Sequence, residues 1–333
     1  MVTLAAKVDL RPATTGVSLA AIEQAAQDLA PYLPPTPLQY SRAISDRTGC
    51  QVHIKIEGVQ PVRSFKVRGA LNKIIHLRPN ERPRGVITAS AGNHGQGVAY
   101  AALTFGIPAT VFMPIDANPL KVEAIHRLGA KVVHAGETYQ DAADAALVAQ
   151  AQSGATYLPA YDDADVIAGQ GSVAVEVVRE LTEFDTVIVP IGGGGLIAGI
   201  TAYLKRVRPK VKIIGVEPTG AAGMHASIAA GKIVSLPKVQ TIADGLAATR
   251  PGRLTFGIVQ RWVEEILLVE DDEMVSAIRL YFEWEHLLAE PAGAAALAGL
   301  MYRYRTSPGE RVVVILSGAN TTGEVMVRAL KSG

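Results

Sequence analysis

The feature that most constrains the fold is an alternation of short apolar runs with longer helical patterns, which begins near residue 85. The runs GVIT, ATVFMP and KVVHAG are separated by the helical patterns HGQGVAYAALTFG and PLKVEAIHRLG, and YQDAADAALVAQAQ follows before ATYLP. Each short run is apolar throughout and rich in β-branched residues, as expected for parallel strands covered on both faces. The pattern predicts a small doubly wound α/β lobe over residues 85–162.

A second alternating series begins near Val166. It contains the helical pattern VAVEVVREL, the strand TVIVP, a glycine cluster, the helical pattern LIAGITAYLKRV and the strands KIIGVE, EILLVE and RVVVILSG. The strand VHIKIE precedes the small lobe and is assigned to this second series. We therefore predict an α/β fold of two doubly wound lobes with a cofactor cleft between them: a large cofactor-binding domain over 1–84 and 163–333, and a small domain over 85–162.

Composition limits the partners and the compartment. Thirty-two basic and 31 acidic side chains leave a net charge of +1, which gives no strong field for nucleic acid or an anionic membrane. The single cysteine, Cys50, excludes an internal disulfide and suits a reducing cytoplasm. The N-terminus does not read as a signal peptide, and Pro190 with the adjacent glycines interrupts the uncharged stretch 186–204. A cytoplasmic protein that acts on small metabolites is expected.

The stretch PIGGGGLIAGI, residues 190–200, lies between two apolar runs and predicts an anion site. Backbone N–H groups of such a loop, together with the N-terminus of the following helix, favour a phosphate. No lysine or hydroxyl residue follows the last glycine, so the loop is not a nucleoside-triphosphate loop of the Walker kind. Gly193, Gly195 and Ala198 also fit a dinucleotide motif, with Glu217 as the ribose-binding acid. A nicotinamide oxidoreductase and a monophosphate ligand therefore both remain open, whereas the apolar flanks disfavour a flexible linker.

Three further segments carry polar side chains where ligands of doubly wound sheets collect. Lys66 precedes a helical pattern and is either a solvated lysine or an imine-forming lysine with lowered basicity. The turn 90–94 after GVIT is either an anion site or a helix cap, and Ser317 at the end of VVVILS is either a ligand group or a cap. Together, the lysine, the two anion turns and the hydroxyl are the parts that a pyridoxal-phosphate enzyme needs, whereas a nicotinamide enzyme has no use for Lys66.

At these segments the sequence resembles the threonine dehydratase and serine racemase family of pyridoxal-phosphate enzymes, which share fold type II with the tryptophan synthase β subunit. The motifs occur in family order between about Pro34 and Asn320. They are SFKVRGA, SAGNHGQG, VIAGQG, VPIGGGGLIAG, GVEP, TIADG, EPAGA and LSGAN. The resemblance implies a lyase that converts L-threonine, and also L-serine, to a 2-oxo acid and ammonia by α,β-elimination of the β-hydroxyl.

The resemblance also implies the site residues. Lys66 is the catalytic residue and carries the cofactor. The other groups around the cofactor are Phe65 beside the ring, Asn93 at the phenolic oxygen, Ser317 at the pyridine nitrogen, Gly245 and Glu290 on the far side of the ring, and Gly192, Gly193, Gly194, Gly195 and Leu196 at the phosphate. The substrate carboxylate meets Ser90, Ala91, Gly92, Asn93 and His94.

Two departures from the family pattern sharpen this interpretation. The racemases have a serine where this chain has Ala91, and a methyl group cannot move a proton, so efficient racemisation is not expected. Their divalent-cation site uses a glutamate, which corresponds to Glu217, and an acidic residue six positions later, where this chain has Gly223. Glu217 is the one metal-ligand candidate, and neither a divalent nor a monovalent cation is expected.

The resemblance also bears on regulation, physiological role and assembly, and it leaves some alternative functions open. The chain ends shortly after SGAN, so we expect no isoleucine-binding regulatory domain and a catabolic role, in a homodimer or homotetramer. Alternatives are a serine racemase, a dehydratase of hydroxyaspartate or an aryl-serine, and a non-catalytic protein that keeps the fold.

Overall fold

The computed structural model describes residues 16–331; residues 1–15, which the sequence assigned to the large domain, lie outside the described residues, as do residues 332–333. The strands are β1 (Leu38–Ser41), β2 (Gln51–Ile56), β3 (Val86–Ala89), β4 (Ala109–Met113), β5 (Lys131–His134), β6 (Thr156–Tyr157), β7 (Thr186–Pro190), β8 (Lys212–Pro218), β9 (Glu265–Val269) and β10 (Arg311–Leu316). The α-helices are α1 (Leu19–Leu29), α2 (Arg42–Thr48), α3 (Lys66–Ile75), α4 (Asn93–Thr104), α5 (Pro119–Arg127), α6 (Tyr139–Ser153), α7 (Ala164–Glu180), α8 (Gly195–Val207), α9 (Gly223–Ala230), α10 (Arg253–Trp262), α11 (Asp271–Glu285), α12 (Pro291–Tyr302) and α13 (Gly323–Lys331). The short 3-10 helices are η1 (Glu57–Val59), η2 (Arg82–Arg84), η3 (Thr219–Ala221) and η4 (Asp244–Leu246).

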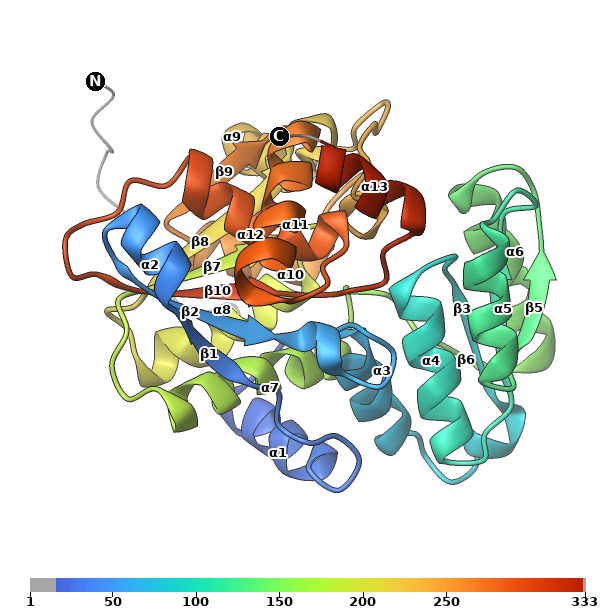
Figure 1. Cartoon of the computed structure of the whole chain (residues 1–333). Coiled ribbons are helices and arrows are strands. Elements are labelled where there is room, and N and C mark those ends of the chain that lie inside the picture. The colour runs from blue at the N-terminus through green and yellow to red at the C-terminus, as the bar shows by residue number, and fades with distance from the viewer. Residues whose placement is uncertain (1–15, 332–333) are drawn as a thin grey trace.

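The strands form two separate sheets, which lie side by side in Figure 1. The six-stranded sheet has the order β1-β2-β10-β7-β8-β9 and is parallel except for the β1–β2 pair. The four-stranded sheet has the order β5-β4-β3-β6 and is parallel throughout. The predicted α/β class with two sheets is therefore confirmed, and the predicted strand VHIKIE lies in the six-stranded sheet as β2.

Alternation along the central strands of the six-stranded sheet gives that sheet two apolar faces. Val313 and Ile315 of β10 pack into the core under α7 and α8, whereas Val312 and Val314 pack into the core under α11 and α12. These side chains are all fully buried. A strand covered on both faces needs apolar residues at every position, which is why the run RVVVIL reads as uniformly apolar.

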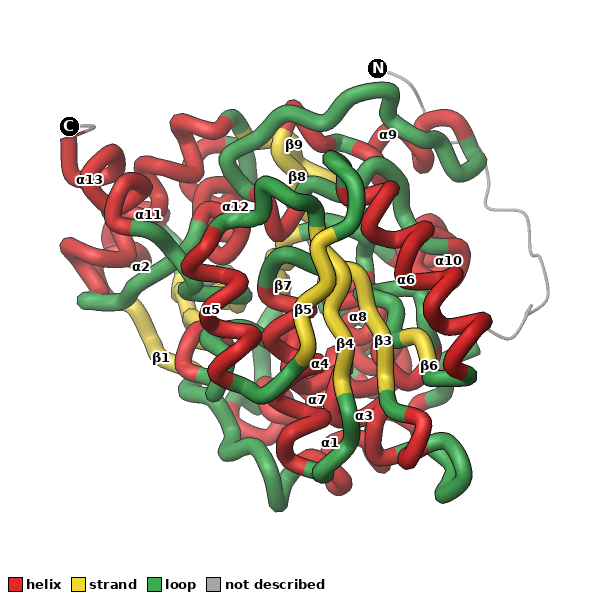
Figure 2. The backbone as a smooth tube through the Cα atoms, turned by 90° about the vertical axis from the view of Figure 1, so that its right-hand side faces the viewer, coloured by secondary structure: helices red, strands yellow, loops and turns green. Residues whose placement is uncertain are grey.

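The four-stranded sheet is covered on one face by α4 and α5 and on the other by α6; Figure 2 looks onto it. Ile87 and Phe112 pack with α6. Val111 packs with α4, and the same core includes Val67 and Leu71 of α3, a helix that precedes residue 85 in the chain. Helix α3 thus lies between the two sheets, and it carries Lys66 at its first position.

A buried ion-pair network fixes α3 against the six-stranded sheet. The Arg68 guanidinium donates from Nε to Oε2 of Glu57 at 2.7 Å and from Nη1 to Oε1 of Glu176, on α7, at 2.6 Å. Lys55 of β2 lies 2.8 Å from Glu176 in the same network. Since removing one partner of a buried pair leaves an uncompensated charge, this network holds the start of α3 in one place.

None of the helices in the described range 16–331 is both long enough and apolar enough to cross a membrane.

Candidate active site

Lys66 lies where the two sheets meet. Its Nζ atom donates a hydrogen bond to the carbonyl of Ala160 at 2.9 Å and lies 5.2 Å from the centre of the Phe65 ring. The surrounding protein removes water from the amine, and this burial lowers its pKa to about 8, against the opposing effect of the Glu290 carboxylate. The neutral amine, the form that a nucleophile or base needs, is therefore a minor but far larger fraction near physiological pH than in an ordinary lysine.

The segment that precedes Lys66 runs beside the end of β10. The backbone N–H of Phe65 donates to the carbonyl of Ser317 at 3.1 Å, and Ser64 forms an isolated antiparallel bridge with Gly318. The buried Ser317 hydroxyl donates to the carbonyl of Ala292, in the first turn of α12, at 3.4 Å. The structure thus brings Lys66, Phe65 and Ser317 together, although 250 residues separate them in the chain.

Asn93 and Glu290 are hydrogen-bonded to each other. The Nδ2 atom of Asn93, at the start of α4, donates to Oε1 of Glu290 at 2.6 Å. Burial raises the pKa of Glu290 to about 7, although the Asn93 amide and two lysines, Lys121 and Lys66, favour the charged form. Asn320 donates to Oδ1 of Asn93 at 2.7 Å and so fixes the orientation of the amide. The sequence identified Asn320 only as the end of the motif series; its bond to Asn93 depends on the tertiary fold.

The glycine loop connects β7 to α8, as predicted, and its conformation requires glycine. Gly194 has a φ of 94°, and a Cβ atom on Gly193 would overlap the ring of Tyr161. A Cβ atom on Gly192 would lie 3.1 Å from the carbonyl oxygen of Gly245, which places the predicted Gly245 against this loop. The side chain of Thr255, on α10, donates to the carbonyl of Gly193 at 2.7 Å. The loop is therefore a fixed, side-chain-free surface at a helix N-terminus, which suits a phosphate.

The predicted carboxylate turn lies between β3 and α4. The backbone N–H of Gly92 donates to the Ser90 hydroxyl at 3.2 Å, which closes the turn. His94 is buried, and its Nε2 atom lies 3.0 Å from the carbonyl of Leu158. Burial and the neighbouring Lys66 ammonium lower the pKa of His94 to about 3, so the ring is neutral and is a structural part of the turn rather than a base. Ala91, between these residues, is half-buried.

Glu217 lies at the end of β8 and binds the N-terminus of α9. Its two carboxylate oxygens accept hydrogen bonds from the backbone N–H groups of Met224, at 2.9 Å, and His225, at 2.7 Å. Burial raises its pKa to about 7, against the effect of these hydrogen bonds. Within residues 16–331, no three or more His, Cys, Asp or Glu side chains gather closely enough to hold a metal ion. Glu217 is thus used as a helix cap, which leaves its oxygens committed to α9 and not to a ribose.

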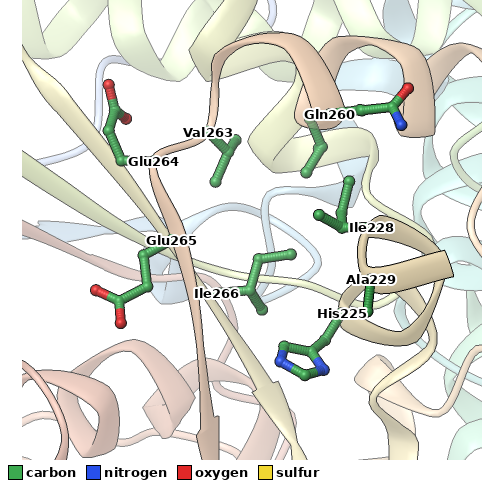
Figure 3. A pocket seen from close by; sticks show the side chains of 9 residues that line it. His225, Ile228, Ala229, Gln260, Val263, Glu264, Glu265 and Ile266 are labelled. Carbon is green, nitrogen blue, oxygen red and sulfur yellow. The ribbon is translucent and has the colours of Figure 1, made fainter. Parts of the chain in front are cut away.

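A cavity of about 310 Å³ lies elsewhere, between α9, α10 and β9 (Figure 3). Its lining residues are His225, Ile228, Ala229, Val259, Gln260, Val263, Glu264, Glu265 and Ile266. None of the predicted site residues lines this cavity, so it is not part of the site around Lys66.

The residues around Lys66 fit pyridoxal phosphate. The amine of Lys66 can bind the aldehyde, the side-chain-free loop before α8 can bind the phosphate, and Ser317 and Asn93 offer polar groups for the ring nitrogen and the phenolic oxygen. A dinucleotide would need a free acid after β8, and Glu217 is occupied.

Known proteins support the same assignment. The family model described as pyridoxal-phosphate dependent enzyme matches residues 29–318. The L-threonine ammonia-lyase of Thermotoga maritima is 39% identical over 317 residues, which cover 95% of this chain and 79% of the relative. The L-threonine ammonia-lyase of Geobacter sulfurreducens is 44% identical over 285 residues, which cover 86% of this chain and 71% of the relative.

Solved structures of relatives have the same fold over nearly the whole chain. The processed form of threonine deaminase isoform 2 from Solanum lycopersicum has a TM-score of 0.89 and 37% identity, and the match covers 94% of this chain and 88% of that one. Maize serine racemase has a TM-score of 0.90 and 33% identity, with 95% and 97% covered. On this evidence, and as its motifs predicted, the chain belongs to the pyridoxal-phosphate-dependent enzyme family.

Proposed function

We propose that this protein is a threonine ammonia-lyase, which converts L-threonine to 2-oxobutanoate and ammonia. The observation that carries the proposal is the position of Lys66. Its amine, with a pKa lowered to about 8, lies beside the end of β10 and the start of α12, in a chain 39% identical to an L-threonine ammonia-lyase over 95% of its length. The reaction removes the α-proton, the β-hydroxyl and the amino group of the substrate, and therefore needs a base at the α-carbon.

When bound, pyridoxal phosphate supplies an aldehyde that links to an amine and a ring that withdraws electrons from the α-carbon. In the proposal, the phosphate is held by the backbone of Gly192 to Leu196 at the N-terminus of α8. Phe65, Asn93, Gly245, Glu290 and Ser317 are the residues that would surround the ring.

Lys66 is the group proposed to hold and move the proton. A base with a pKa near the working pH combines a useful neutral fraction with a useful proton affinity, and burial gives Lys66 this property. The Ala160 carbonyl, 2.9 Å from Nζ, directs the amine to one place. The α4 N-terminus and the turn of Ser90 to His94 are proposed to bind the substrate carboxylate, since helix N-terminal N–H groups favour anions.

Ser317 favours elimination over reactions that need a long-lived negative charge on the ring. A neutral hydroxyl, unlike a carboxylate, does not hold a proton on a pyridine nitrogen. With the cofactor bound, Ser317 would thus favour prompt loss of the β-hydroxyl of the substrate, which is the outcome that a dehydratase needs.

Finer parts of the proposal rest on sequence features. L-Serine is proposed as a second substrate because it also carries a β-hydroxyl. A catabolic role in the cytoplasm, a homodimer or homotetramer, and a division into domains 1–84 with 163–333 and 85–162 complete the proposal.

The first experiment is the visible absorption spectrum of the purified protein before and after L-threonine is added. We expect a band of bound pyridoxal phosphate that changes as 2-oxobutanoate accumulates. A band that L-threonine leaves unchanged, with no product, would overturn the proposed substrate and direct attention to other hydroxy amino acids. If no band forms even with added pyridoxal phosphate, nicotinamide binding becomes the alternative to measure.

Serine racemase is the second candidate because maize serine racemase has the same fold over 97% of its chain. Ala91 argues against it, since a methyl group cannot transfer a proton to the second face of the substrate. We expect Ala91→Ser to raise the rate of D-serine formation from L-serine, measured by chiral chromatography. Ala91→Gly, which adds no hydroxyl, is the control; an equal rise in both variants would contradict the role of the hydroxyl.

A further inference from the structure

An ion pair joins the two sheet bodies beside the site. Lys121 lies on α5, which packs on the four-stranded sheet, and its ammonium contacts the carboxylate of Asp244 in η4. The two residues are 123 positions apart in the chain. The Lys121 side chain is 20% exposed and that of Asp244 is 58% exposed, so the pair lies at the rim of the contact between the bodies rather than inside either core.

The Asp244 end of this pair is adjacent to the proposed cofactor groups. Asp244 directly precedes Gly245, whose carbonyl lies against Gly192 of the phosphate loop, and a Cβ atom on Gly245 would lie 3.0 Å from the Cβ atom of Ala292 in α12. A shift of Asp244 would therefore move a backbone segment that contacts both the phosphate loop and α12.

The Lys121 end is close to Glu290. The two charges interact, and each favours the ionised form of the other. Glu290, the residue before α12, also accepts the hydrogen bond from Asn93 at the start of α4, which is a second contact between the two sheet bodies. The charged groups that face Lys121 are thus Asp244 and Glu290.

We propose that Lys121 is a positioning residue: by pairing with Asp244 it holds α5 against η4 and so fixes Gly245 and Glu290 relative to Asn93. The inference deepens the threonine ammonia-lyase function and rests on it for its kinetic test. An ion pair with one largely exposed partner is weak, because water competes for both charges. A weak pair at the rim can open and form again at little cost in free energy, while it still favours one arrangement of the two bodies.

The first test needs neither cofactor nor substrate. Amide hydrogen exchange is measured on the apoprotein for wild type, Lys121→Met, Asp244→Asn and the control Arg127→Met. Arg127 pairs with Glu123 on the same helix at 2.9 Å, with side chains 76% and 55% exposed, and does not reach the other body. We expect faster exchange in α5 and η4 in the first two variants and wild-type exchange in η4 in the control. Unchanged exchange of α5 in Asp244→Asn would overturn the proposal.

The second test separates positioning from general stability. We expect Lys121→Met and Asp244→Asn each to raise KM for L-threonine about threefold to fivefold, with less than a twofold change in kcat, and the double variant to be no worse than either single variant. Lys121→Arg should keep the wild-type KM. The proposal would be overturned if the increases in KM of the two single variants added in the double variant. It would also be overturned if kcat fell by as large a factor as KM rose. If the wild-type protein does not act on L-threonine, the proposed function fails, and the exchange experiment still decides the role of Lys121.

Discussion

At the scale of single residues, the environment of Lys66 sets the pH at which its amine is free of a proton. Burial lowers the pKa from 10.5 to about 8, so the neutral fraction rises steeply between pH 7 and 9 instead of above pH 10. We expect the rate of the spectral change on adding pyridoxal phosphate to apoprotein to rise through this range. Stopped-flow absorbance measures it.

Lys66→Ala is the matched control for this experiment. It should show no such spectral change and should lose essentially all turnover, because the variant has no amine at this position. Within the described residues, Lys66 is the lysine whose amine donates to the Ala160 carbonyl in the site. A rate of spectral change whose pH dependence has its midpoint near 10.5 would contradict the role assigned to the Lys66 amine. Full turnover by Lys66→Ala would contradict it as well.

Gly193 is a residue at which a single methyl group should be costly. A Cβ atom there would overlap the ring of Tyr161, and the neighbouring Gly195 also packs against that tyrosine. Overpacking of this kind costs about 1–3 kcal/mol. We expect Gly193→Ala to lower both the free energy of unfolding and the affinity for pyridoxal phosphate, measured by urea titration and by absorbance titration.

Gly257 provides the control for Gly193. It lies inside α10, and a Cβ atom there would meet no atom within 4 Å. Gly257→Ala should raise the free energy of unfolding by about 0.5–1 kcal/mol, because alanine has the higher helix propensity. A similar loss of cofactor affinity in both variants would show that the Tyr161 contact is not the cause.

Sequence predicts which residue types lie at strand ends better than it predicts their partners. Lys66, Asn93 and Ser317 could be singled out because each lies where a strand or helix begins or ends. Their contacts join α3, α4 and β10, and no spacing within one segment encodes those contacts. Lys121 and Asp244 were missed for this reason, since each reads as an ordinary charged residue on its own element.

At the scale of elements, α9 depends on a remote carboxyl group. Glu217 has a pKa of about 7 in the folded protein, against 4.5 in its ordinary state. The folded state therefore binds more protons between these values, and the stability that the neutral carboxyl gives is lost as the pH rises through 7. We expect the free energy of unfolding of wild type to fall relative to that of Glu217→Gln between pH 5 and 8, measured by urea unfolding.

A thermal melt with and without a chelator tests the alternative role of Glu217, as a metal ligand. Because both of its oxygens accept N–H groups of α9, EDTA should leave the melting temperature of wild type unchanged. A lower melting temperature with EDTA in wild type but not in Glu217→Gln would instead indicate a metal ion at this carboxylate.

The elements that sequence predicted are those with their own pattern. The alternation from residue 85 onward predicted β3 to β5 and α4 to α6, and apolar runs predicted β7, β8 and β10. Helices α9 and α10 were not predicted, because their N-terminal N–H groups are capped from elsewhere: by Glu217 for α9, and for α10 by Asp162, which accepts from Arg253 at 2.9 Å. Strand β1 is a four-residue edge strand that pairs antiparallel with β2, and so short a run gives no clear periodicity.

At the scale of the whole molecule, the proposed cofactor groups come from both sheet bodies, so binding should stabilise both. A ligand at 100 times its Kd adds about 2.7 kcal/mol to the free energy of unfolding when it binds only the folded state. We expect pyridoxal phosphate to slow amide exchange in both β3 and β10. We also expect the protein to melt in a single transition, at a higher temperature when the cofactor is bound. Protection confined to the six-stranded sheet would show that α4 and its turn do not take part.

The strand order of the large sheet has a consequence for biosynthesis. Strand β2 pairs with β10, residue 54 with residue 314, and Phe65 bonds to Ser317 next to that pair. During translation the chain leaves the ribosome from its N-terminus, so the segment that carries Lys66 waits for the last strand to emerge before its contact with Ser317 can form. A ribosome-bound nascent chain that lacks β10 therefore lacks Ser317 and the strand beside Lys66, and we expect capture of the cofactor to be a late event that follows completion of the sheet.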